Sequence, residues 1–132
     1  MTAERPRDRL GRPLRQGAAP DPDVPPVPDV QGLSDDEVLT LALRFVEDGL
    51  PFHAHEVCEQ RWRAAPPPDR EHWRALAQWG AAETHAARGN TVGATRLATR
   101  ALDGLKSGSE SDEAHVDGPC QVRVRERCQS LI

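Results

Sequence analysis

Five residues in the middle of the chain have side chains suited to acid–base chemistry or to binding a metal ion. His55, Glu56 and Glu59 lie within five positions, and the spacing of four between His55 and Glu59 puts both on one face of a helix. Gln78 and His85 are seven apart, so they share a face of a second helix. If these helices pack antiparallel, the sequence predicts one polar cluster inside a small helical bundle.

One chemistry that fits the cluster is the binding of a divalent cation. Helical bundles hold such ions with imidazole and carboxylate groups at helical spacing, which here would come from His55, Glu59 and His85. The pattern His-Glu-x-x-Glu, however, lacks the second histidine of the His-Glu-x-x-His motif. The sequence therefore predicts no cofactor, with a divalent metal as the less favoured alternative.

A second chemistry is general acid–base catalysis. His55 could exchange a proton with a glutamate of the cluster, in a pocket walled by Trp62 and Trp73. The residues supply no evident nucleophile, because Cys58 lies off the face of the cluster.

The third interpretation is structural, and it is the one we favour. The glutamates would accept hydrogen bonds from His55 and from the Gln78 amide, and such a paired network fixes one arrangement of helices. We therefore predict a binding or scaffolding module and lean against an enzyme. The alternative is a metal-dependent or acid–base hydrolase centred on His55, Glu56, Glu59 and His85. An open pocket beside His55 would favour the hydrolase, whereas a closed and fully paired network would favour the module.

The other notable residues have structural explanations. Gly89 and Asn90 predict a tight corner in which the glycine is left-handed and the asparagine caps the next helix. Gly93 is expected to let two helices approach closely. His72, in the first turn of a predicted helix, is expected to be exposed.

Four helices are needed to position the cluster, and their boundaries follow from caps and breakers. Ser-Asp-Asp-Glu at 34–37 is a capping box, Pro51 suits a first helical turn, and three prolines at 66–68 end the second helix. Asp69 is expected to cap the third helix, and Asn90 or Thr91 the fourth. Short connections between amphipathic helices predict an all-α antiparallel bundle over residues 34–106.

The remaining segments differ in composition. Seven of the twelve prolines precede residue 29 and five arginines fall in the first fifteen residues, so 1–33 is predicted to be a disordered tail. The tail could bind the phosphates of a nucleic acid or a membrane, but a solvated leader is the favoured explanation. Residues 107–118 are predicted to form a polar linker, and residues 119–132 a short C-terminal helix.

Composition excludes several classes of function. The net charge of −4 argues against a nucleic-acid-binding face, and no apolar run approaches the ~18 residues of a membrane span. The arginine-rich N-terminus lacks the apolar stretch of a secretion signal, so three cysteines indicate free thiols in the cytoplasm. We expect a protein partner or self-association through the helix at 34–48 or the helix that starts near 90.

Two motifs resemble domain of unknown function 309, a family of small helical prokaryotic proteins. The stretch 51–63 is similar to its F-x-A-H-E-x-x-E-x-x-W motif, and 75–78 with 89–94 are similar to its G-L-I-Q and G-N-x-x-G-A segments. The resemblance covers about residues 34–106 and implies a bundle fold without an assigned reaction.

The chain departs from the family pattern at two positions. Ala75 stands where the family usually has glycine, which suggests slightly different helix packing, and Cys58 stands where it favours a larger apolar residue. Neither change removes a polar group of the cluster.

Overall fold

Five helices make up the regular structure of this protein. The computed structural model describes residues 6–111 and 118–132, and within them it contains no β-strand. The helices are α1 (Asp35–Glu47), α2 (Pro51–Ala64), α3 (Pro67–Ala87), α4 (Thr91–Ser111) and α5 (Pro119–Ser130). The predicted all-α class and the short C-terminal helix are thereby confirmed.

The helix starts follow local rules. The hydroxyl of Ser34 accepts the Glu37 N–H at 3.1 Å and the Glu37 carboxylate accepts the Ser34 N–H at 3.0 Å, so the capping box is present. In α3 the cap is Pro66 rather than the predicted Asp69, which lies in the first turn. Proline is tolerated in a first turn because the N–H that it lacks would have no intrahelical partner there.

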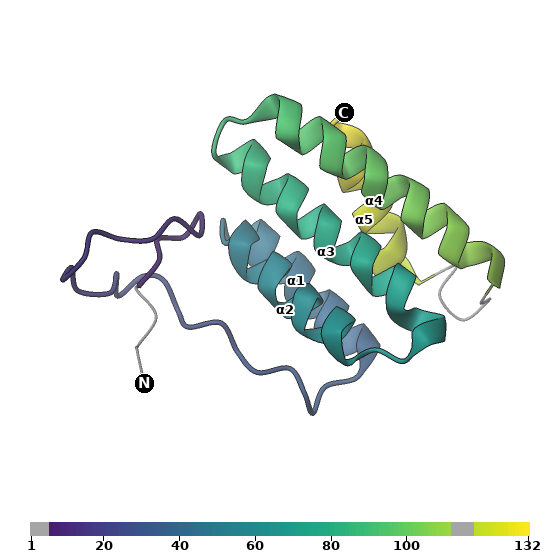
Figure 1. The fold of residues 1–132 in the computed structure, drawn as a ribbon, viewed down its shortest axis with the longest axis horizontal. Coiled ribbons are helices and arrows are strands. Elements are labelled where there is room, and N and C mark those ends of the chain that lie inside the picture. The colour runs from purple at the N-terminus through teal and green to yellow at the C-terminus, as the bar shows by residue number, and fades with distance from the viewer. Residues whose placement is uncertain (1–5, 112–117) are drawn as a thin grey trace.

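The helices pack in two layers. In Figure 1, α2, α3 and α4 run side by side with α3 in the middle, while α1 and α5 lie behind them and contact each other. The largest fully buried side chains are contributed by all five helices and include Leu43, Val57, Trp73, Trp79, Leu105 and Val124. The central position of α3 makes it the helix against which the polar cluster of α2 must pack.

The segment after residue 106 differs from the prediction. α4 continues to Ser111, so the first five residues of the predicted linker at 107–118 are helical. Serine and glycine lower helix propensity without stopping a helix as proline does. Residues 112–117 lie outside the described part of the chain, and Gly118 is the N-cap of α5.

The N-terminal segment lies along α2 (Figure 1). Among its described residues, 6–33, it has no helix and one isolated β-bridge. The Gln60 amide joins α2 to this segment, donating to the Pro28 carbonyl at 2.9 Å and accepting the Val30 N–H at 3.1 Å. Val30 is 2 % exposed. Disorder of residues 1–33 stays a prediction, and these contacts provide the means to test it.

None of the helices in the described residues is both long enough and apolar enough to cross a membrane.

Candidate functional site

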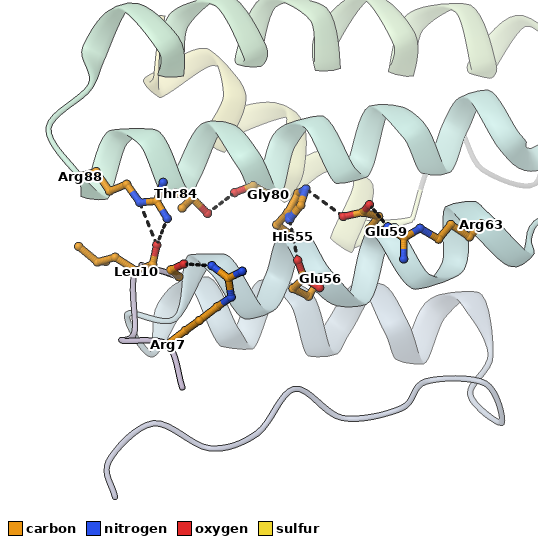
Figure 2. Close-up of polar contacts among 10 residues, drawn as sticks. Arg7, Leu10, His55, Glu56, Glu59, Arg63, Gly80, Thr84 and Arg88 are labelled. Carbon is orange, nitrogen blue, oxygen red and sulfur yellow. Dashed lines mark hydrogen bonds and ion pairs between the residues drawn. The ribbon is translucent and has the colours of Figure 1, made fainter. Parts of the chain in front are cut away.

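The centre of the site is a group of three side chains on α2. Figure 2 shows His55 between two carboxylates, with its Nδ1 3.5 Å from Glu56 Oε1 and its Nε2 3.5 Å from Glu59 Oε2. The three residues can offer one ligand atom each, all within 4.8 Å of one another. Their side chains are 25 %, 35 % and 21 % exposed, so the group lies at the rim of the bundle and not in its core.

Close contact with α3 sets the position of His55. A Cβ atom on Gly80 would lie 2.5 Å from the His55 Cα, so only a glycine allows the two backbones to come this near. The Thr84 hydroxyl donates to the Gly80 carbonyl at 2.8 Å, one turn further along α3 (Figure 2). The crossing point of α2 and α3 therefore lies directly at the histidine of the cluster.

Positive charges surround the two carboxylates. The Arg63 guanidinium donates to Glu59 at 2.5 Å. Hydrogen bonding to His55 is the largest cause that lowers the pKa of the Glu56 carboxyl; Arg63 and Arg7 lower it further, and burial acts in the opposite direction. Glu56 is therefore ionised at neutral pH.

The N-terminal segment brings Arg7 to this side of α2. Arg88 donates two hydrogen bonds to the Leu10 carbonyl, from Nε at 2.9 Å and from one terminal nitrogen at 2.6 Å (Figure 2). The Arg7 guanidinium lies 5.3 Å from the centre of the Phe52 ring and donates to the Gly11 carbonyl at 2.7 Å. An arginine of the predicted tail thus contributes to the field around the cluster.

An open cavity of about 220 Å³ adjoins the cluster. It lies between α2, α3 and α4, and its lining includes His55, Glu59, Trp62, Gln78, Ala81 and Leu97. The lining thus brings Gln78 and the predicted wall residue Trp62 together with His55 and Glu59 around one open cavity.

Two of the predicted site residues lie elsewhere. His85 contacts the Asn90 amide at 3.1 Å and is absent from the ligand group on α2, because it is five residues, ~7.5 Å of helix, beyond Gly80. Trp73 is 1 % exposed and lies in the core, with the Arg61 guanidinium 5.9 Å from its ring. Five residues separate Trp73 from Gln78, a rotation of ~140° around α3, so the two cannot face one cavity.

The corner between α3 and α4 has the predicted form. Gly89 has a φ of +83°, and the Asn90 side chain accepts the Gly93 N–H at 2.9 Å as the cap of α4. A Cβ on Gly93 would lie 2.7 Å from the Asn90 amide and 3.1 Å from His85 Nδ1. Gly93 therefore makes room for the capping side chain and for His85 of α3, which agrees with the predicted close approach of the two helices.

Three buried polar contacts were not predicted. Glu83 accepts from the Trp79 indole at 3.0 Å and forms a two-point ion pair with Arg127. His72, expected at the surface, is 5 % exposed and contacts the Gln121 amide at 3.0 Å. His53 contacts the Pro25 carbonyl at 2.6 Å. His72 and Glu83 lie at helical spacing with Leu76, Trp79 and Gly80, so the sequence of α3 could have marked both as part of a buried face. No local sequence pattern indicates their partners on α5.

Comparison with known proteins gave one match. A search of curated proteins and a search of solved structures each found no match. The model of the family described as "Domain of unknown function (DUF309)" matches residues 39–97, which include the three cluster residues, Gln78 and the corner between α3 and α4. The resemblance to domain of unknown function 309, expected from the sequence, is thereby confirmed over these residues.

Proposed function

We propose that this domain is a binding module that holds a divalent cation at His55, Glu56 and Glu59. The observation that carries the proposal is the convergence of three ligand atoms within 4.8 Å, at the side of an open cavity. A closed structural network would be buried and tightly bonded. Here each N–O separation at His55 is 3.5 Å, so the imidazole is joined to the two carboxylates by long and weak hydrogen bonds.

The chemistry of the three groups suits a borderline transition metal. Ligands about 2.0–2.2 Å from one ion lie at most roughly 4.4 Å apart, so small side-chain rotations would close the group around an ion. One imidazole and two carboxylates are ligands that suit Zn²⁺, Mn²⁺ or Fe²⁺. Further coordination positions would face the cavity between α2 and α3, where a bound molecule could complete them.

The open cavity at His55 also suits the hydrolase alternative, but Cys58 supplies no nucleophile for it. Cys58, the cysteine on α2, is fully buried, and burial raises the pKa of its thiol to about 12. The thiolate, which is the nucleophilic form, is therefore not available at neutral pH. A metal-dependent hydrolase would need the same cation, so cation binding is tested first.

The test uses the full chain purified without a histidine tag. We expect near-stoichiometric Zn²⁺, Mn²⁺ or Fe²⁺ by elemental analysis, and a rise in melting temperature when the metal is added to stripped protein. His55→Ala and Glu59→Gln should lose both effects, while Glu126→Gln, the same change at an exposed position of α5, should retain them. Absence of metal and of any thermal shift in the unmodified chain would reject the proposal, as would full metal content in both cluster variants.

We also propose that the protein self-associates through α1. A shallow groove of about 370 Å³ on its exposed side is lined by Leu33, Thr40 and Leu41, with Asp36 and Arg44 at its two ends. Asp36 and Arg44 are each four residues from Thr40. In an antiparallel pair with its two-fold axis at Thr40, each aspartate would lie level with the arginine of the second copy.

Sedimentation velocity tests this pairing. Arg44→Asp should shift the protein toward the monomer, because it replaces the arginine opposite Asp36 and leaves acidic side chains at positions 36, 37 and 44 of both copies along the contact. Exchanging both charges, Asp36→Arg with Arg44→Asp, should restore the dimer. A wild-type chain that is monomeric at high micromolar concentration would contradict the proposal.

The cytoplasm is the compartment that we propose for this protein. Cys58, Cys120 and Cys128 are all free, and two of them are buried. Free thiols persist in a reducing environment, which supports this location.

A further inference from the structure

The cavity beside the cluster has an apolar wall and one polar side chain, Gln78, without a partner among the described residues. Ala77, Ala81 and Leu97 supply small apolar surfaces from α3 and α4. Gln78 is half-buried and lines the cavity, and its side chain forms no hydrogen bond with the described residues. A half-buried amide without an internal partner can bind a ligand at little cost in lost internal bonds.

Arg74 provides the charge at the same cavity. It forms an ion pair with Glu71 at 3.8 Å, and the two side chains are 53 % and 70 % exposed, so this ion pair is weak. Arg74 and Gln78 also line an adjoining cavity of about 230 Å³ that reaches α4. The guanidinium therefore lies at the junction of two cavities, where it can bind an anionic group without breaking a strong contact.

We infer that this cavity binds a small organic carboxylate, with the carboxylate at Arg74 and Gln78 and the apolar part against Ala77, Ala81 and Leu97. A guanidinium binds a carboxylate through two parallel hydrogen bonds, and the Gln78 amide can donate a third. The inference deepens the proposed function and rests on it, because the other end of the cavity is His55 and Glu59, where a bound cation would meet the ligand.

The volume of the cavity limits the ligand. Its 220 Å³ is below the usual volume of sites for drug-sized ligands. At ~30 Å³ for each water in the liquid, the cavity corresponds to about seven waters. A carboxylic acid with a chain of about four to six carbons fits this space. Trp62, at the α2 side, would cover the apolar part of such a chain.

Butyrate is the probe for a titration followed by ¹⁵N–¹H NMR on the full chain. We expect saturable shifts of the amides of residues 74–81, and no saturation with butyramide, which has the same shape without the charge. Arg74→Gln should weaken butyrate binding about tenfold or more, as loss of a charge-assisted pair does. Arg70→Gln, the same change at an exposed position one turn earlier on α3, should leave it unchanged.

A second variant and the cation separate this inference from the proposed function. Ala81→Leu should block butyrate by filling the cavity, with the fold checked by circular dichroism. Both titrations are run with and without the metal.

Metal binding without saturable butyrate shifts would overturn the carboxylate inference alone. Butyrate binding that is lost in Arg74→Gln but occurs in a chain that binds no metal would overturn the cation proposal alone. Equal affinity of wild type and Arg74→Gln would also overturn the carboxylate inference.

Discussion

At the scale of single residues, the charge of Glu56 depends on its neighbours. Hydrogen bonding to His55, with Arg63 and Arg7 nearby, lowers the pKa of this carboxyl below 4.5 in the folded state. A carboxyl with a lowered pKa stabilises the fold above its unfolded pKa, and this stabilisation is lost as the pH falls through the folded pKa.

Glu56→Gln should therefore change the pH dependence of stability in a defined direction. At pH 7 the variant should unfold more easily than the wild type, by less than about 1 kcal/mol because the group is partly exposed. As the pH falls below 4.5 the difference should shrink, since the carboxyl is protonated first in the unfolded chain and then, below its lowered pKa, in the folded one. Urea unfolding at pH 7, 5 and 3.5 measures this, and a difference that grows on acidification would contradict the assigned role.

At the scale of elements, a buried ion pair attaches α5 to α3. Glu83 is 5 % exposed and accepts from both Trp79 and Arg127. Removing the arginine leaves a buried carboxylate without its opposite charge, which costs more than the loss of a surface pair.

Arg127→Leu should lower the free energy of unfolding by about 2–3 kcal/mol, less than for a fully buried pair because Arg127 is 43 % exposed. Arg123→Leu is the matched control on the same helix, where the pair with Glu47 has side chains 52 % and 48 % exposed. Its loss should cost less than about 1 kcal/mol. Equal effects of the two variants in urea unfolding would show that α5 is not held by the buried pair.

At the scale of the whole molecule, the open question is whether the N-terminal segment is part of the fold. Val30 belongs to the hydrophobic core and is 2 % exposed, and the Gln60 amide accepts the Val30 N–H and donates to the Pro28 carbonyl. A segment that is disordered in solution would derive no stability from these contacts.

Val30→Ala tests this directly. If the segment is docked, the variant should lose about 1–2 kcal/mol, as expected when buried methyl groups are removed. Val92→Ala, at a position 68 % exposed on α4, should be near neutral. Equal stability of Val30→Ala and wild type in urea unfolding would support the disordered tail that the composition of residues 1–33 predicts.

The sequence by itself determined the helices and the face of α2 that carries the cluster. The capping box at Ser34, the proline at 51 and the corner at Gly89 act within one or two turns, so their outcome can be read locally. The spacing of His55 and Glu59 likewise placed both on one face, because the periodicity of a helix fixes it.

Only the tertiary structure decided which faces meet. Gly80 sets the crossing of α2 and α3 at His55, and this registry brings Gln78 to the cavity and leaves His85 one turn or more beyond it. The partners of His72 and Glu83 come from α5 and are 49 and 44 residues away in the chain. Each helix can present its polar residues to several neighbours. Which residues meet is decided by complementary packing between distant segments, and no local sequence pattern records it.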